Sequence, residues 1–266
     1  MLHCQCYGDP QQPALVLLHG FLGSGADWQP LLARLSQTFY CITVDLPGHG
    51  QSQHTLQHSP AFTECATLVQ QSVLALGIEQ FHLLGYSLGG RIALHLAAEY
   101  PQHLLSLQLE SCHPGLVTEA EREQRASNDQ LWQQRLAQLS MSDFLALWYQ
   151  QAVFADLSEQ QRQTLIAQRA QQDPASLLAM YAGTSLALQQ PLWQLPSQLT
   201  CAVHYYYGTR DAKFTALAQR WQQQAPELRL HAIDAVGHNC HKGNPVAFLA
   251  QLQPALNDFA EKMNDA

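Results

Sequence analysis

The sequence FHLLGYSLGGR, residues 81–91, joins a short apolar run to a serine that stands between two glycines. The apolar run has the length and composition of a buried strand, and the residues after the serine have helical spacing. A G-x-S-x-G pentapeptide in this setting is typical of a sharp turn that lifts a reactive serine clear of a sheet. The glycines allow such a turn because a Cβ would crowd it. The alternative interpretation is a plain glycine-rich turn between a strand and a helix.

Strand-like and helix-like segments alternate on both sides of Ser87. Further short apolar runs predict strands at residues 14–18, 40–44, 105–109, 202–207 and 228–233. Helical spacing is found at residues 28–35, 62–76, 88–100, 212–224 and near 245–260. Short buried strands that alternate with helices favour a mostly parallel sheet flanked by helices on both faces.

The pattern changes after Cys112. Residues 118–189 are rich in Gln, Ala, Leu and Glu and contain no strand-like run, so we expect helices throughout. Helix starts are expected near four polar residues, Thr118, Ser142, Ser158 and Asp173. The sequence therefore predicts an α/β core made of residues 1–112 and 198–266, interrupted by a helical cap at residues 113–197.

Composition and charge restrict the partners of this chain. Its 266 residues include 47% hydrophobic residues, which is enough for a sizeable core. Acidic side chains outnumber basic ones by 21 to 13, for a formal charge of −8. This balance argues against nucleic acid and against an anionic membrane surface, because both need a basic face. We expect a small-molecule substrate.

The cysteines and the N-terminus indicate the compartment. Seven cysteines are scattered along the chain without a CxxC pair. Residues 1–10 lack a basic start followed by an apolar run, and no stretch of about 18 apolar residues could span a bilayer. We expect a cytoplasmic protein with reduced thiols and no stable membrane association.

A serine hydroxyl needs a neighbouring base to become reactive. In chains with this serine turn the acid and then the histidine follow downstream, each just after a strand. Asp211 and His238 occupy these positions, and the glycine before His238 frees the loop. Asp234 is the rival acid, but it lies only four residues before His238. The order Ser87, Asp211, His238 predicts a catalytic triad on an α/β-hydrolase fold.

Developing negative charge next to Ser87 requires two N–H donors. We expect them to be the backbone N–H groups of Leu88 and Phe21, the latter in the sequence HGFLG, residues 19–23. The alternative is that HGFLG forms only a flexible turn. Residues 238–241 contain two histidines and a cysteine but lack the spacing of metal ligands, so we expect neither a metal nor a cofactor.

Several motifs together point to one family. They are HGFLG (19–23), DLPGHG (45–50), GYSLGGR (85–91), ESCHPGL (110–116), WYQQAVF (148–154) and GHN (237–239). Over nearly its whole length the chain resembles the 2-succinyl-6-hydroxy-2,4-cyclohexadiene-1-carboxylate synthase (MenH) family of menaquinone biosynthesis. The arginine after the serine turn and WYQQAVF narrow the choice most, because the other motifs are widespread in α/β hydrolases.

The resemblance implies a lyase that eliminates pyruvate from a tricarboxylate. We expect it to work without a cofactor and as a monomer. It implies that Arg91 and Tyr86, both in the serine motif, contact the substrate. In the cap it implies two further carboxylate-binding arginines, Arg125 and Arg169, and a pocket-lining Trp148. Arg122 lies on the same predicted helical face as Arg125 and is the alternative to it.

Two other functions remain compatible with the motifs. A hydrolase of carboxylic esters or of C–C bonds would use the same triad, but a neutral ester would not need Arg91 or the arginines of the cap. A ligand-binding protein on an inactive hydrolase fold is a second alternative, against which the intact triad argues.

Overall fold

A sheet of seven strands forms the centre of the computed structural model, which describes the backbone of residues 1–264 and the side chains of residues 1–257. The strands are β1 (Cys4–Tyr7), β2 (Ala14–Leu18), β3 (Tyr40–Val44), β4 (Phe81–Tyr86), β5 (Leu104–Glu110), β6 (Ala202–Gly208) and β7 (Arg229–Ile233). Their order is β1-β3-β2-β4-β5-β6-β7, and only β1 runs antiparallel to its neighbour.

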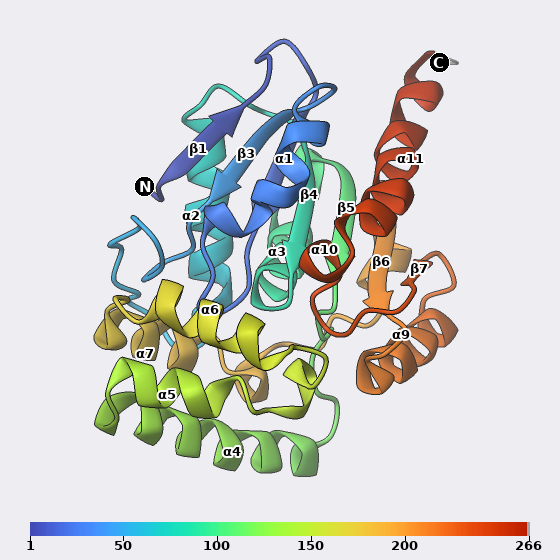
Figure 1. Ribbon diagram of the computed structural model, residues 1–266. Coiled ribbons are helices and arrows are strands. Elements are labelled where there is room, and N and C mark those ends of the chain that lie inside the picture. Colours follow the sequence, from blue (N-terminus) through green and yellow to red (C-terminus); the bar gives the residue numbers. More distant parts are fainter. Residues whose placement is uncertain (265–266) are drawn as a thin grey trace.

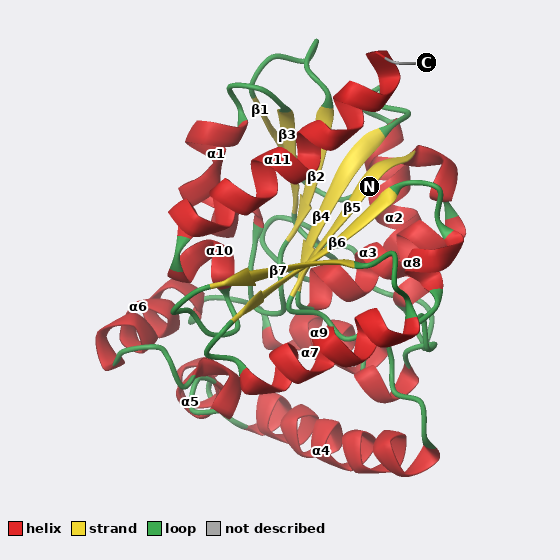
Figure 2. Cartoon of the chain, turned by 90° about the vertical axis from the view of Figure 1, so that its right-hand side faces the viewer, coloured by secondary structure: helices red, strands yellow, loops and turns green. Residues whose placement is uncertain are grey.

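Helices cover both faces of the sheet (Figure 2). One face carries α1 (Gln29–Leu35), α10 (Cys240–Gly243) and α11 (Pro245–Asn264). The other face carries α2 (Phe62–Leu74), α3 (Leu88–Glu99), α8 (Leu195–Gln198) and α9 (Ala212–Gln224). Short 3₁₀ helices, η1 (Gly25–Trp28) and η2 (Pro101–His103), precede α1 and β5. The predicted fold class, a mostly parallel sheet flanked by helices, is confirmed.

The core divides in two because successive strand side chains point to opposite faces. In β2, Val16 and Leu18 pack with α2 and α3, whereas Leu15 and Leu17 pack with α1 and α11. Both sets are fully buried. The uninterrupted apolar runs in the sequence are therefore strands buried on both faces.

The sequence analysis missed strand β1. It is an edge strand of four residues, and its two central residues, Gln5 and Cys6, are exposed. A short polar edge strand has neither the apolar run nor the alternation on which the other predictions depended.

Four longer helices lie beyond the carboxyl ends of the parallel strands (Figure 1). They are α4 (Glu119–Gln138), α5 (Met141–Trp148), α6 (Glu159–Arg169) and α7 (Pro174–Gly183), with 3₁₀ turns η3 (Ala152–Phe154) and η4 (Leu186–Leu188). We call residues 113–197 the cap. Its last residues, including Trp193 and Leu195, pack into the same cluster as α2 and α3.

Three of the four predicted helix starts are confirmed. The side chains of Thr118, Ser158 and Asp173 cap α4, α6 and α7 by accepting backbone N–H groups. The start near Ser142 was wrong by two residues, because the Ser140 side chain accepts the Asp143 N–H and caps α5 instead. Among residues 1–264, none of the helices has the length and apolar character needed to cross a bilayer.

Candidate active site

Ser87 occupies the turn between β4 and α3. Its backbone adopts φ 51° and ψ −108°, a conformation that L side chains rarely adopt. The Ser87 N–H donates to the Glu110 carbonyl of β5 at 2.8 Å, which ties the turn to the neighbouring strand. Gly89 is required here because a Cβ would lie 2.3 Å from the Leu18 carbonyl oxygen. The strained turn is thus held by its surroundings, and Ser87 stays partly exposed.

The structure brings Ser87, His238 and Asp211 together from three separate loops. Nδ1 of His238 lies 2.9 Å from Oδ2 of Asp211, and Nε2 of His238 lies 3.4 Å from Oγ of Ser87. Because an ionised carboxylate only accepts hydrogen bonds, the proton sits on Nδ1 and Nε2 is left to accept the serine proton. The serine–histidine contact is long, as is common before substrate binds.

Asp211 is fixed by a second bond. Its carboxylate also accepts the N–H of Phe214 at 3.1 Å, so it caps α9. Burial raises the pKa of Asp211, but the hydrogen bond and the charge interaction with His238 outweigh burial, and the pKa lies below its ordinary value. Asp234, the rival acid, is exposed. The geometry therefore favours Asp211 as the partner of the histidine.

The two expected oxyanion donors flank Ser87. Leu88 is the first residue of α3, where a backbone N–H has no acceptor within the helix. Phe21 lies in residues 19–23, here called the oxyanion loop, and shares a cavity wall with Ser87. The described residues offer the Phe21 N–H no hydrogen-bond acceptor. Both donors are thus available to a bound anion.

Two buried histidines hold the oxyanion loop. His19 donates from Nδ1 to the Gly20 carbonyl at 2.7 Å and accepts the Leu46 N–H on Nε2 at 3.0 Å. His49 accepts the Leu22 N–H at 3.1 Å. Burial lowers the pKa of His19, and it lowers the pKa of His49 to about 3, with His19 adding to the shift. Each ring is neutral and combines one donor with one acceptor, as these contacts require.

A cavity of about 720 Å³ lies between the core and the cap, with Ser87 and His238 in its wall. Among the charged side chains of the lining, cations outnumber carboxylates although the chain as a whole is acidic. Six cations line the cavity against two carboxylates, Asp27 and Asp156. The cations are Arg91, Arg125, Arg169, Arg210, Lys213 and Lys242. Such a lining is suited to a substrate with several negative charges.

Arg91 lies one helical turn beyond Ser87 and contacts only uncharged groups. Its Nε donates to Oε1 of Gln189 at 2.6 Å, and its Nη2 donates to the Thr184 carbonyl at 2.5 Å. Its guanidinium also lies 4.9 Å from the centre of the Phe62 ring. Burial and the charge of Arg125 lower the pKa of Arg91 to about 9 although Asp129 opposes the shift from a distance, so Arg91 is still charged at neutral pH. No carboxylate among the described residues pairs with it.

Arg125 and Arg122 differ in where they lie. Arg125 lines the cavity and donates from Nε to Asp129 at 2.7 Å. Asp129 is buried and also accepts hydrogen bonds from Tyr181 and Ser185. Arg122 donates to the Leu116 carbonyl and does not line the cavity. The structure thus favours Arg125 over its alternative.

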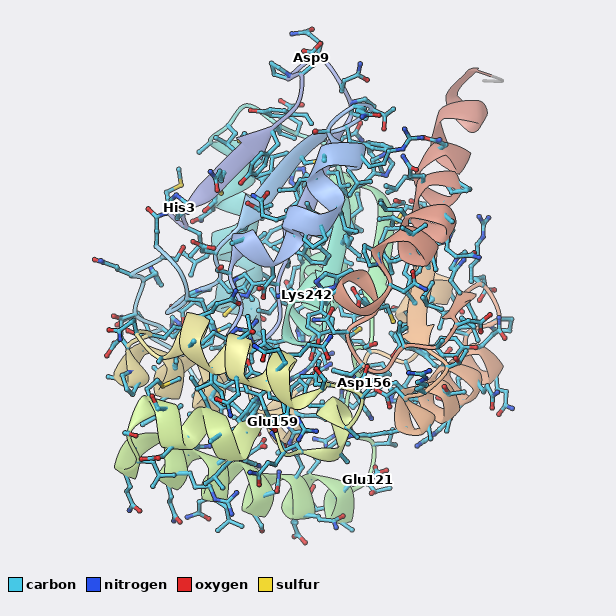
Figure 3. All side chains as sticks on the ribbon, in the orientation of Figure 1. His3, Asp9, Glu121, Asp156, Glu159 and Lys242 are labelled. Carbon is cyan, nitrogen blue, oxygen red and sulfur yellow. The ribbon has the colours of Figure 1, made fainter. Side chains whose placement is uncertain are left out.

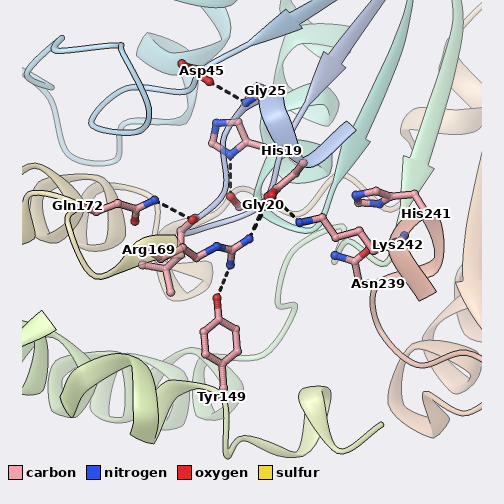
Figure 4. Close-up of polar contacts among 12 residues, drawn as sticks. His19, Gly20, Gly25, Asp45, Tyr149, Arg169, Gln172, Asn239, His241 and Lys242 are labelled. Atoms are coloured by element: carbon pink, nitrogen blue, oxygen red, sulfur yellow. Dashed lines mark hydrogen bonds and ion pairs between the residues drawn. The ribbon is translucent and has the colours of Figure 1, made fainter. Parts of the chain in front are cut away.

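Arg169 connects the cap to the core. Its Nη1 donates to the Tyr149 hydroxyl, and its Nη2 lies 3.0 Å from Oδ2 of Asp27 in η1. Lys242 of α10 pairs with the same carboxylate. Figure 4 shows Arg169 between Tyr149 and Lys242. Burial raises the pKa of Asp27, but the charges of Arg169 and Lys242 outweigh it and hold the pKa at about 2.

Tyr86 lines the cavity from the core and Trp148 lines it from the cap. The buried Tyr86 ring lies 5.6 Å from the His238 ring, measured between centroids. The ring of Trp148, from the cap, packs against the ring of Phe21 of the oxyanion loop, with 5.2 Å between the ring centroids. The described residues contain no group of three potential metal ligands. Ser87, His238 and the two backbone N–H groups form an arrangement that can move a proton beside a bound anion.

The chain is similar to known proteins over most of its length. A family model described as "alpha/beta hydrolase fold" matches residues 13–245. A 2-succinyl-6-hydroxy-2,4-cyclohexadiene-1-carboxylate synthase of Pectobacterium atrosepticum is 40% identical, covering 93% of this chain and 95% of the relative. The synthase of that name from Yersinia pseudotuberculosis serotype O:3 is 42% identical, covering 92% and 88%.

The chain belongs to the 2-succinyl-6-hydroxy-2,4-cyclohexadiene-1-carboxylate synthase family. This confirms the resemblance found from the motifs. Among solved structures, MenH from S. aureus superimposes with a TM-score of 0.90 at 25% identity, covering 98% of this chain and 100% of that one. A thermophilic esterase from Thermogutta terrifontis superimposes with a TM-score of 0.80 at 19% identity, covering 97% and 93%, and shows the shared fold alone.

The sequence analysis missed two carboxylates near the active site, Glu110 and Asp156. Glu110 ends β5, is fully buried, and accepts the N–H groups of Cys240 and His241 and the His241 ring. It therefore holds the loop that follows His238. A charged residue at the end of an apolar strand was the available signal, because functional groups collect at the carboxyl ends of parallel strands.

Asp156 is the second carboxylate. It belongs to the cap, and its Oδ2 accepts the Gly237 N–H at 2.9 Å, next to His238. Figure 3 shows Asp156 where the cap meets the core. Nothing in the sequence around Asp156 indicated this contact, because it joins residues 81 positions apart.

Proposed function

We propose that this chain eliminates pyruvate from 2-succinyl-5-enolpyruvyl-6-hydroxy-3-cyclohexene-1-carboxylate in menaquinone biosynthesis, with Ser87, His238 and Asp211 as the proton-abstracting machinery. The main observation in favour of this anionic substrate is the position and charge of Arg91. It lines the cavity one turn from Ser87 and has no carboxylate partner among the described residues. A guanidinium beside a triad that is not paired with a carboxylate favours an anionic substrate, and this substrate has three carboxylates.

The contacts support a stepwise transfer of charge. His238, oriented by Asp211, accepts the Ser87 hydroxyl proton, and the serine oxygen removes a proton beside a substrate carbonyl. The N–H groups of Phe21 and Leu88 bind the enolate oxygen that results. As the carbonyl re-forms, a new C=C bond forms from the former enolate carbon into the ring, the existing ring C=C bond shifts one position toward the leaving group, and the C–O bond to the enolpyruvyl group breaks. The proton returns to the departing enolpyruvate, which becomes pyruvate.

Arg125 and Arg169 also line the cavity and can bind further carboxylates of the substrate. Arg125 and Arg169 already have carboxylate partners, Asp129 and Asp27. Each guanidinium has five N–H donors in a planar fork, so it can bind a substrate carboxylate while it keeps one partner. We assign Arg91, Arg125 and Arg169 to substrate carboxylates, with Tyr86 and Trp148 lining the pocket. Against an ester hydrolase stands this concentration of positive charge, which a neutral ester does not use.

The test is pyruvate release. The purified chain is mixed with enzymatically prepared substrate, and pyruvate is followed with a coupled dehydrogenase assay. Turnover of a p-nitrophenyl ester is measured in parallel. We expect kcat/KM for the tricarboxylate to exceed that for the ester by several powers of ten. Comparable values, or ester turnover alone, would support the hydrolase instead.

We also propose that the protein acts as a cytoplasmic monomer. Every group assigned above comes from one chain, and all seven cysteines are free thiols, as a reducing compartment favours. Sedimentation equilibrium measures the mass directly. A dimer whose dissociation abolished activity would contradict this proposal.

A further inference from the structure

Gln189, a residue of the cap, is hydrogen-bonded to Arg91 of core helix α3. Its side chain is buried, with 1% of its surface exposed, and both ends of its amide are used. Oε1 accepts the Nε–H of Arg91 at 2.6 Å, and Nε2 donates to the His113 carbonyl at 2.9 Å. The donor end determines how the amide is turned, so the oxygen faces the guanidinium. Gln189 thus holds Arg91 with an uncharged acceptor.

A second acceptor from the same segment fixes the orientation of Arg91. The Thr184 carbonyl accepts from Nη2 at 2.5 Å. These two bonds use the Nε–H and one Nη2–H of the five donors, and leave both Nη1–H groups and the other Nη2–H. The Nε side of the fork is occupied, so a carboxylate can bind two-pronged only at the Nη1/Nη2 end. Arg91 therefore presents one defined edge to the cavity.

Two further arginines of the pocket are held differently. Arg125 pairs with Asp129, and Arg169 pairs with Asp27. A carboxylate in the place of the Gln189 amide would have nearly the same shape and would form a permanent ion pair with Arg91. That ion pair would compete with the substrate carboxylate for the same positive charge.

We propose that Gln189 is a positioning residue that orients Arg91 for a substrate carboxylate without pairing it with a carboxylate of the protein. This inference rests on the proposed function, because the anion in question is a carboxylate of that substrate. It explains why Arg91 is held by neutral groups while Arg125 and Arg169 have carboxylate partners, and it makes Gln189 a determinant of specificity that never contacts the reacting atoms.

Two substitutions separate charge from orientation. Gln189→Met keeps the length and neutrality of the side chain but removes both hydrogen bonds. Gln189→Glu keeps an acceptor for Nε of Arg91 and adds a negative charge. Gln190→Glu is the matched control, because it adds the same charge one residue away on an exposed side chain. Binding of the product, a dicarboxylate, is measured by calorimetry, KM and kcat by pyruvate release, and folding by Tm.

We expect Gln189→Met to weaken product binding and raise KM about 10-fold, as the loss of charge-assisted orienting bonds predicts. Gln189→Glu should weaken both about 100-fold or more, with kcat changed less than KM. Gln190→Glu should stay within about twofold of the original chain, since exposed charges contribute little. Turnover of a small neutral ester should be similar in all three.

Three results would overturn the inference. Product binding by Gln189→Met equal to that of the original chain would show that orientation by Gln189 is unnecessary, and this result remains informative even if Gln189→Glu fails to fold. Equal losses in Gln189→Glu and Gln189→Met would show that neutrality does not matter. A loss of kcat without a change in KM or product binding would place the role of Gln189 in the triad. Absence of pyruvate release by the original chain would instead refute the proposed function.

Discussion

The cavity has a wall formed by residues of the α/β core (the core wall) and a wall formed by residues 113–197 (the cap wall). The two walls hold their polar groups by different means. On the core wall, Ser87, Asp211 and His238 follow strand ends, and backbone contacts and buried polar groups fix their loops. On the cap wall, Arg125 and Arg169 stand on helices and are held by side-chain ion pairs. Groups held by backbone have little positional freedom, whereas paired side chains can exchange partners. We therefore expect the core wall to determine the rate of the chemistry and the cap wall to determine affinity.

The largest effect is expected on the core wall, from Ser87→Ala. It removes the proposed base and should lower kcat by about three to six powers of ten. Tm and product binding should change little, because one hydroxyl is removed from a partly exposed turn. Pyruvate release, a melting curve and calorimetry measure the three quantities. Retention of more than about a tenth of the activity would place the chemistry on another residue.

Asp211→Asn should come next, with a loss of kcat of about three to four powers of ten, because an amide does not hold the imidazole in the required tautomer. Asp234→Asn is the matched control and should be mild, since Asp234 is exposed. The two variants are compared in one pyruvate assay. If Asp234→Asn were the severe change, the assignment of the acid would be wrong.

Arg91→Lys tests the residue that links the walls, because Arg91 stands on core helix α3 and is held by Thr184 and Gln189 of the cap. Lysine keeps the charge but cannot form the planar fork. We expect kcat/KM for the tricarboxylate to fall by roughly one to three powers of ten. Turnover of a small neutral ester should barely change.

Equal losses of Arg91→Lys on both substrates would mean that Arg91 supports the serine turn and has no role in recognition. No loss on either would leave the lyase assignment dependent on family membership alone. Either result would remove the strongest physical argument for an anionic substrate.

The smallest effect is expected where the walls touch, at Asp156. Its bond to the Gly237 N–H is one cap contact to the loop that carries His238. Asp156→Ala should lower kcat about three- to tenfold, as expected for one net hydrogen bond, and should change KM less. Asp156→Asn keeps an oxygen acceptor and should retain most of the activity.

Steady-state kinetics of the two Asp156 variants separate the contributions. Identical behaviour of alanine and asparagine would show that charge at this position matters and the hydrogen bond does not. No loss of kcat in either variant would show that the Asp156 contact does not contribute to positioning His238. The core wall would then hold the histidine loop without help from the cap.

The sequence by itself predicted the core wall in detail. Residues 14–18 and 40–44 were identified as strands with their correct ends, because a strand buried on both faces leaves an uninterrupted apolar run. The strand–turn–helix pattern located Ser87, and the chain order of strand ends selected Asp211 and His238. The strand predictions depended on a few consecutive residues each, and the structure brings Ser87, Asp211 and His238 together, while their catalytic roles remain our proposal.

Tertiary structure alone decided the electrostatics of the cap wall. The pairing of Arg169 with Asp27 joins residues 142 positions apart, and that of Gln189 with Arg91 joins residues 98 apart. Helical periodicity does not distinguish an arginine on a solvated face from one in a cavity, as Arg122 and Arg125 illustrate. Local backbone preference is encoded in neighbouring residues, but the partner of a long charged side chain depends on how distant helices pack, and only the folded chain determines that.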